Sequence, residues 1–388
     1  MEDKYKDPEK AKLKKLIKFM LEVEGSDLHI KPKNKAKLRI NGEIEEIEDS
    51  EVYTKEETLA LAKELLRTKY QEFIDKKAID FTYTLEEDET HRFRINIFFQ
   101  KDGTSLVLRT IPTKISTLAE LKLPEGLYEI PKKKRGLILV TGVTGSGKST
   151  TLAALINEIN ENQKKHILTI EDPIEFIHED KMSIISQRSV GQDAISFQDA
   201  LRSGLREDPD IILVGEIRDV ETVEMALHAV ETGHMVFSTL HTANASESIR
   251  RIIGMFPPEE QHRIRYVLSK TIGAIVSQRL VKTIDGKRTP AIELLLETPR
   301  ISQLIMENRD DEIEATLDLF KAQYKTHSFD EHLYQLQKNN IITEENALNE
   351  ASNPDNLKLK LQGLVMTDEN SEDDGDKKVE TSGISIKL

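Results

Sequence analysis

The chain has 388 residues, which is enough for two or three domains that each bury a core of their own. It contains no cysteine, and this excludes disulfide scaffolds, cysteine zinc sites and thiol catalysis. The net charge of −14 argues against a dedicated nucleic-acid protein, because phosphate contacts require clustered Lys and Arg. We therefore expect two domains and no stable nucleic-acid partner.

The charge is distributed unevenly along the sequence. Residues 1–140 hold 28 Lys and Arg against 27 Asp and Glu, whereas residues 141–352 hold 22 against 34. The N-terminal part is thus the better candidate for contact with anionic partners. The sequence has no run of about twenty apolar residues, and its first residues lack the apolar centre of a signal peptide. We expect a cytoplasmic protein whose membrane contact is at most peripheral.

Residues 1–112 predict a small α+β domain. Apolar residues at helical spacing predict a helix around residues 13–21. A second helix is expected to begin after Thr54, because Thr54 and Glu57 have the spacing of a capping box. An Asn-Gly pair predicts a hairpin within residues 38–44. Further strands are expected at residues 80–85, 91–99 and 105–111.

Three further segments follow. Residues 113–134 are expected to form a linker, since prolines interrupt them. Residues 135–352 alternate short apolar runs with longer helical patterns, which is typical of an α/β domain wound around a parallel sheet. Residues 353–388 form an acidic tail that we expect to be disordered. The runs expected as strands buried on both faces are residues 136–140, 166–170, 210–214 and 235–239.

A glycine-rich motif follows the first of these runs and precedes a helical pattern. This setting predicts a phosphate loop, because glycines let backbone N–H groups turn toward phosphate oxygens at a helix N-terminus. Lys148 would reach the β- and γ-phosphates of ATP, and the Ser149 hydroxyl would ligate Mg²⁺. The alternative is a glycine-rich turn between two buried elements. The predicted nucleotide-binding residues are Gly142, Val143, Thr144, Gly145, Ser146, Gly147, Lys148, Ser149 and Thr150.

Carboxylates follow two other predicted strands. Parallel strands present their carboxyl ends at one edge of the sheet, so these side chains are expected beside the phosphate loop. Glu216 is a candidate to orient the attacking water or to support the metal. Glu171, Asp172 and Glu175 crowd the end of the other strand, and such crowding is costly unless a cation or water shares them. Glu175 is thus a second candidate, with a charged surface turn as the alternative.

Histidines and arginines complete the set of candidates. His234 and His241 flank one apolar run, where each could sense the γ-phosphate or serve a purely structural role. Arg92 and Arg94 share one face of a predicted N-terminal strand. Arginines on a separate domain suit a γ-phosphate contact supplied by a neighbouring subunit, and surface salt bridges are the alternative.

Together these motifs resemble those of the secretion ATPases of type IV pilus and type II secretion systems, most closely the pilus retraction branch typified by PilT and PilU. The resemblance spans about residues 20–352. Besides the phosphate loop, the matching segments are Ser26-Asp27-Leu28-His29, an aspartate box at residues 170–176, a Walker B segment at residues 207–219 and a histidine box at residues 232–242.

The resemblance implies a homo-hexamer with a PAS-like N-terminal domain and a RecA-like P-loop ATPase domain in each subunit, and ATP between domains of adjacent subunits. It implies that Glu216 and Glu175 serve catalysis. It further implies an inner-membrane pilus platform protein as partner, with the ring at the pilus base. The arginines that would complete the site are Arg92, Arg94 and Arg109, and the box histidines are His234 and His241.

The branch within this family is indicated by three features. Assembly ATPases of the family usually carry a four-cysteine zinc element, which this chain cannot form. Residues 300–307 match a C-terminal motif linked to retraction, but Ser302 and Met306 replace its two arginines. The end of the chain is similar to PilU-type chains. These features favour a PilU-like accessory to a PilT-type paralogue, with three alternatives: a self-sufficient retraction motor, a DNA-transfer ATPase and a nonhydrolysing ring subunit.

Overall fold

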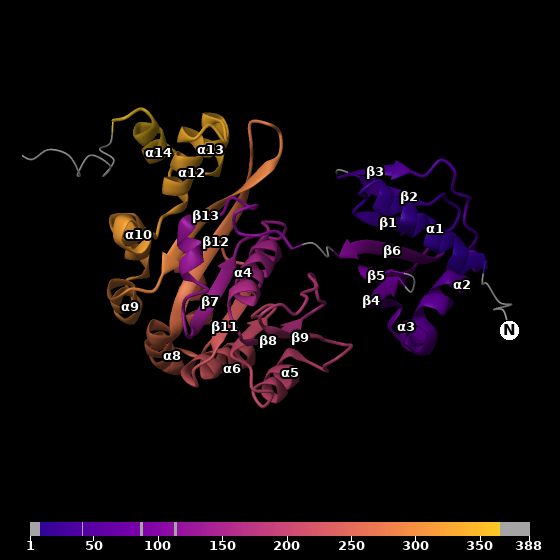
Figure 1. Ribbon diagram of the computed structural model, residues 1–388, viewed down its shortest axis with the longest axis horizontal. Helices are drawn as coiled ribbons and strands as arrows, with labels where there is room; N and C mark the ends of the chain where they lie inside the picture. The colour runs from indigo at the N-terminus through magenta and orange to yellow at the C-terminus, as the bar shows by residue number, and fades with distance from the viewer. Residues whose placement is uncertain (1–7, 41, 86–87, 112–114, 365–388) are drawn as a thin grey trace, which may run out of the picture.

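A computed structural model describes residues 8–40, 42–85, 88–111 and 115–364. Within these ranges the strands form two sheets, one of six strands in the N-terminal part and one of seven in the rest. Figure 1 shows each sheet with its own helices. The chain therefore has the predicted fold class, an α+β domain followed by an α/β domain.

The N-terminal domain is an antiparallel sheet with helices on one face. Leu28 and Ile30 are buried against these helices, and the alternation of a strand directs Asp27 to the opposite face. Thr54 and Glu57 form the predicted capping box. The sheet order is β3-β2-β1-β6-β5-β4. The elements are α1 (Pro8–Glu22), β1 (Asp27–Ile30), β2 (Lys37–Ile40), β3 (Glu43–Glu46), α2 (Lys55–Leu66), α3 (Tyr70–Lys76), β4 (Ala78–Leu85), β5 (Asp88–Gln100) and β6 (Gly103–Ile111).

The larger sheet is mainly parallel. Its strands are β7 (Gly136–Thr141), β8 (His166–Glu171), β9 (Ile184–Ser189), β10 (Ile211–Val214), β11 (Met235–Leu240), β12 (Ile272–Lys282) and β13 (Arg288–Leu296). They lie in the order β13-β12-β7-β11-β10-β8-β9, and β13 runs antiparallel to β12. The four apolar runs expected as buried strands correspond to β7, β8, β10 and β11, which confirms that prediction.

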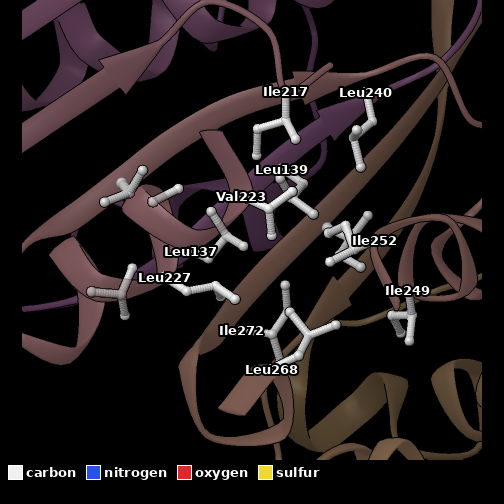
Figure 2. Close-up of a cluster of buried hydrophobic side chains, with 14 of the residues drawn as sticks. Leu137, Leu139, Ile217, Val223, Leu227, Leu240, Ile249, Ile252, Leu268 and Ile272 are labelled. Carbon is white, nitrogen blue, oxygen red and sulfur yellow. The ribbon is translucent and has the colours of Figure 1, made fainter. Parts of the chain in front are cut away.

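Helices cover both faces of this sheet, so strand residues of either parity are buried. On one face, Leu137 and Leu139 of β7 pack with Val223 and Leu227 of α6 (Figure 2). On the other face, Ile138 packs against α4. Burial on both faces explains the unbroken apolar runs. The helices are α4 (Lys148–Asn162), α5 (Phe197–Gly204), α6 (Val220–Glu231), α7 (Ala245–Gly254), α8 (Pro258–Thr271), α9 (Pro299–Met306), α10 (Ile313–Leu319), α11 (Lys321–Tyr324), α12 (Phe329–Lys338), α13 (Glu344–Glu350) and α14 (Pro354–Leu361).

The segment expected as a linker at residues 113–134 differs from an exposed connection. Leu118, Leu127 and Ile130 are fully buried in the cluster that also contains α4 and β7. Leu127 belongs to a 3-10 helix, Glu125–Glu129. From Leu118 onward this segment is therefore part of the core of the second domain, because its apolar residues pack with those of α4 and of the larger sheet.

The C-terminal tail also begins later than expected. Residues 354–361 form helix α14, in which Asn353 caps the N-terminus and Leu357 is buried. Leu357 packs with Phe329 and Leu333 of α12, so the expectation of disorder from residue 353 is wrong for this helix. Residues 365–388, which carry the acidic run, lie outside the described residues. Among the residues described, no helix combines the length and the apolar character needed to cross a membrane.

Candidate functional site: a pocket at the phosphate loop

The predicted phosphate loop joins β7 to α4. Gly142, Gly145 and Gly147 have φ angles of 141°, 81° and 90°, in the region that favours glycine. A Cβ atom at Gly142 would lie 2.3 Å from the carbonyl oxygen of Gln278. Gly147 is the N-cap of α4 and offers no side-chain acceptor, so the first N–H groups of the helix stay available to an anion. The loop thus fits a phosphate group.

Gln278 of β12 supports the loop from behind. Its Nε2 donates to the Ser146 carbonyl oxygen at 2.6 Å, and the Thr151 hydroxyl donates to its Oε1 at 2.7 Å. The Ser146 hydroxyl is buried and has no hydrogen-bond partner among the described residues, which also fits a polar ligand at the loop. The sequence analysis missed Gln278. Its one sequence signal is a place within a polar triplet, Ser277-Gln278-Arg279, that interrupts an apolar run.

Lys148 is nearly buried at the start of α4. Its ammonium donates to the carbonyl oxygens of Gly142 at 2.8 Å and Val143 at 3.1 Å. Burial lowers the pKa of Lys148, and the carboxylates of Glu216 and Glu175 oppose that shift. The two acidic groups therefore favour the charged form of the lysine, which is the form that a phosphate contact requires.

A pocket of about 730 Å³ opens at this edge and brings most of the candidates together. Its walls come from the phosphate loop, the aspartate box, the segment after β10, the segment after β11 and two N-terminal strands. The predicted residues that line it are Thr144, Gly145, Gly147, Lys148, Ser149, Thr150, Glu175, Glu216, His241, Arg94 and Arg109. Gly142, Val143 and Ser146 belong to the same loop but are not among the described residues that line the pocket.

Glu216 lies two residues beyond β10, at the floor of the pocket. Arg218 holds its carboxylate with two contacts, Nε at 2.8 Å and Nη2 at 2.7 Å from Oε2. His241 Nε2 lies 3.6 Å from the other carboxylate oxygen. Arg218 thus holds one carboxylate oxygen of Glu216 by two charge-assisted contacts and leaves the other oxygen on the side of His241. Arg218 was noticed in the sequence only as part of the motif.

The aspartate box is organised by its first glutamate. Glu171 accepts from the Thr169 hydroxyl at 2.7 Å and from the backbone N–H of Glu175 at 3.3 Å. Burial raises the pKa of Glu171, and the nearby charge of Glu175 adds to the rise. Glu175 itself is exposed at the pocket. Both glutamates therefore line the pocket, Glu171 held by hydrogen bonds and Glu175 more exposed.

Arginines of the N-terminal sheet reach the pocket of their own chain. Arg94 of β5 lies opposite Arg109 of β6. Arg109 Nε donates to Asp27 at 2.7 Å, and Arg94 Nε donates to Asp80 at 3.1 Å. The sequence resemblance implied a site between adjacent subunits, whereas a single chain already brings these arginines to its own phosphate loop. Arg92, the third predicted arginine, is absent from the lining among the described residues.

His234 lies away from the pocket. β11 runs parallel to β7, so its start at Met235 and its end at Leu240 lie at opposite edges of the sheet. The His234 ring lies 2.9 Å from the Ala229 carbonyl oxygen and 3.1 Å from the Thr232 hydroxyl, at the end of α6. A catalytic part for His234 is therefore inconsistent with this geometry. Its ring closes the last turn of a helix instead.

The pocket also contains oxygen donors that fit a magnesium ion. The Ser149 hydroxyl and the Glu216 carboxylate line the same cavity. Among the described residues there is no group of three His, Asp or Glu that could hold a metal by itself. Mg²⁺ is commonly held by one or two protein oxygens together with substrate phosphates, so this sparse donor set is suitable for it.

Comparison with known proteins identifies the family. The family model described as type II/IV secretion system protein matches residues 2–323. The chain is 41% identical over 346 residues to the type IV pilus retractation ATPase PilT of Pseudomonas aeruginosa, covering 88% of this chain and 98% of that protein. It is 39% identical over 352 residues to the type IV pilus ATPase PilU of the same species, covering 90% and 91%.

A solved structure gives the same result. The crystal structure of the pilus retraction motor PilT with bound ADP matches with a TM-score of 0.82 and 41% identity, covering 89% of this chain and 98% of that chain. The match extends over both domains, so the larger domain is RecA-like, as the resemblance implied. The chain therefore belongs to the family of type II/IV secretion system proteins and is an ATPase of the secretion and pilus class.

Proposed function

We propose that this ATPase powers the retraction of type IV pili, and with it twitching motility, as a ring of six copies. The observation that carries the proposal is one pocket that joins Lys148, Glu175 and Glu216 to Arg94 and Arg109. It occurs in a chain that is similar over nearly its whole length to a pilus retraction ATPase. The ring would lie on the cytoplasmic side of the inner membrane, against a platform protein of the pilus base.

Each pocket residue has a role that its surroundings support. Lys148 would stabilise negative charge that develops on the transferred phosphoryl group. Glu216, which Arg218 holds at one carboxylate oxygen, would orient the attacking water. Glu175 is accessible and would accept the proton of that water. When bound through the Ser149 hydroxyl, Mg²⁺ supplies positive charge to the phosphate oxygens.

Two arginines would act at the outer phosphate, and a histidine would act beside Glu216. Arg94 and Arg109 carry fixed positive charge into the pocket from the N-terminal sheet, and planar guanidinium groups suit phosphate oxygens. His241 lies against Glu216 and would report the state of that carboxylate to the segment leading into α7. The N-terminal domain thus contributes charge, while the second domain contributes the groups that handle water.

The identities to PilT and to PilU are nearly equal, so overall similarity does not distinguish the two branches. We therefore base the choice between them on helix α9. Ile301, Leu304 and Ile305 are buried, so the helix packs as the sequence predicted. Ser302 and Met306 occupy the positions at which the retraction motif has arginines, and Met306 is exposed. Removal of two fixed charges from this helix favours an accessory ATPase that works beside a PilT-type paralogue.

The test uses a piliated strain that lacks every other retraction ATPase. We expect labelled pili to stay extended when this chain is expressed alone, and to retract when a PilT-type partner is added. Lys148→Ala is the matched control, because it removes the phosphate contact while the loop backbone stays; it should abolish the contribution of this chain. Normal retraction by this chain alone would identify a self-sufficient motor. No effect on pili in either strain would contradict the retraction proposal, and nucleic-acid stimulation of hydrolysis would then favour a DNA-transfer ATPase.

A further inference from the structure

A buried carboxylate outside the pocket holds the start of α7. Glu293 is 2% exposed and lies on β13, opposite Ser277 of β12. Its Oε1 accepts from the backbone N–H of Ala245 at 2.7 Å and from the Ser277 hydroxyl at 3.2 Å. Ala245 is the first residue of α7, so the carboxylate faces the positive end of that helix. Glu293 thus ties α7 to the β12–β13 pair.

The segment between β11 and α7, which carries His241, is clamped to the first turn of that helix. The Asn244 side chain accepts from the Glu247 N–H at 2.8 Å, and the Glu247 carboxylate accepts from the Ala243 N–H at 2.8 Å. The hydroxyls of Thr242 and Ser248 lie 2.6 Å apart in the interior. These bonds make residues 242–248 one unit, and His241 directly precedes it, so an anchor on Ala245 positions the unit and the histidine at its start.

The hydrogen bond from the Ala245 N–H to Glu293 changes strength when the Glu293 carboxylate is protonated. Burial raises the pKa of Glu293 to about 7; the charge of Glu314 on α10 adds to the rise. Arg279 on β12 and the hydrogen bonds from Ala245 and Ser277 act in the opposite direction. An ionised carboxylate accepts a hydrogen bond more strongly than a protonated one. The hydrogen bond from Ala245 to Glu293 therefore becomes stronger as the pH rises through neutrality.

We propose that Glu293 is a positioning residue that fixes the His241 segment against the sheet and so aligns His241 with Glu216 for hydrolysis. The path is short: Glu293 holds Ala245, Ala245 belongs to the clamped unit, and His241 at its start lies 3.6 Å from Glu216. The inference rests on the proposed function, since the alignment matters for turnover only if the pocket hydrolyses ATP.

The first test compares the steady-state kinetics of full-length wild type and Glu293→Gln between pH 6 and pH 8.5. Glutamine keeps the size and one acceptor oxygen but does not titrate. We expect the wild-type kcat to rise about fivefold through neutral pH, and the variant to stay near the low value with KM for ATP within about twofold. A variant that keeps the wild-type kcat and the rise would overturn the inference, because the titrating group would then be another one, such as His241.

Glu331→Gln is the matched control. Glu331 is a buried glutamate on α12, where it pairs with Lys321 and Lys360 away from the pocket. The Glu331→Gln variant also replaces a buried carboxylate by an amide, so it measures the general effect of that change on the kinetics. We expect it to keep the wild-type pH profile. An equally flattened profile in Glu331→Gln would show that the effect is not specific to Glu293.

The second test needs no turnover. Hydrogen exchange of a peptide covering residues 241–248 is measured in nucleotide-free wild type, Glu293→Gln, Glu293→Ala and Glu331→Gln. We expect faster exchange in both Glu293 variants, more in Ala, and wild-type exchange in the control. Unchanged exchange in Glu293→Gln, which keeps the shape of the site, would refute the anchor even if the Ala variant fails to fold. If wild type hydrolyses no ATP, the proposed function fails while this measurement still decides whether Glu293 holds the segment.

Discussion

At the scale of single residues, the pocket depends on how Glu216 is held. Arg218 contacts one of its carboxylate oxygens twice, and His241 approaches the other. Lys148 lies close enough for the Glu216 charge to oppose the effect of burial on its pKa. Glu216 is thus the point at which the strand edge, the histidine segment and the phosphate loop meet.

Glu216→Gln should separate binding from turnover. The amide keeps the size of the side chain but removes the charge that acts on water, so we expect kcat to fall by about 100- to 1,000-fold with nucleotide affinity within a few fold of wild type. Phosphate release and equilibrium binding of a fluorescent nucleotide measure the two quantities. Glu207→Gln is the control, since Glu207 also pairs with an arginine, Arg188, outside the pocket. Equal losses in both variants would contradict the assignment.

Strand direction explains which site residues could be predicted from the sequence. The placement of Glu175, Glu216 and His241 at the pocket was predictable, because each follows a buried strand and parallel strands end at one edge. His234 looked equivalent to His241, and only the direction of β11 separates them. Gln278 contacts the phosphate loop across 132 residues, a pairing that no local pattern in the sequence records.

At the scale of elements, the strands and helices followed from their apolar periodicity, but the ends of the second domain did not. α14 lies in a polar, charged stretch, and a single buried side chain, Leu357, fixes it to the helices beside it. Leu118 and Ile130 occur between prolines, which concealed their part in the core. Short segments with one or two buried residues carry too little periodicity to be recognised.

The junction between β13 and α12 contains two enclosed histidines. The His332 Nδ1 accepts from the Ile292 N–H at 2.9 Å, and the backbone of His327 pairs with Leu294. Their rings lie 5.2 Å apart. Burial lowers the pKa of His327 to about 4 and that of His332 to about 3, and the nearby Glu331 opposes both shifts. Both rings are neutral at physiological pH.

Acid should therefore weaken this junction. The unfolded histidine binds a proton below its ordinary pKa of about 6.5 while the folded one does not, so stability is lost as the pH falls from about 6.5 toward 4. Each histidine contributes up to about 1.4 kcal/mol per pH unit in that window. His332→Asn keeps an acceptor for Ile292 and does not titrate, so urea unfolding of this variant should show a shallower pH dependence. The same slope in variant and wild type would contradict the prediction.

At the scale of the whole molecule, one chain builds its pocket from both domains. Arg94 and Arg109 come from the N-terminal sheet, and Lys148 comes from the larger one. The Thr82 hydroxyl donates to the Gln192 side chain at 2.8 Å, a second link between the domains. This arrangement predicts that the arginines serve the phosphate loop of their own subunit.

Mixed rings test this prediction. When chains carrying Arg109→Ala are combined with chains carrying Lys148→Ala, every pocket lacks one group if the arginine acts within its own chain, so we expect no recovery of hydrolysis. Co-purification of the two variants through different affinity tags would confirm that mixed rings form, and wild-type chains diluted into either variant provide the positive control. Recovery to a substantial fraction of wild type would show that Arg109 reaches the neighbouring subunit, as the sequence resemblance implied.

Strand β12 lies between the phosphate loop and the C-terminal helices and contacts both. Gln278 and Arg279 are consecutive residues, so their side chains leave the strand on opposite faces. Gln278 grips the phosphate loop, while Arg279 donates to the Glu350 carbonyl oxygen at 2.5 Å and lies 4.0 Å from the centre of the Phe329 ring. Residues 274–282 are paired with β13 throughout, which stiffens the strand. β12 thus joins the phosphate loop to the C-terminal helices directly, through the side chains of two adjacent residues on one fully paired strand.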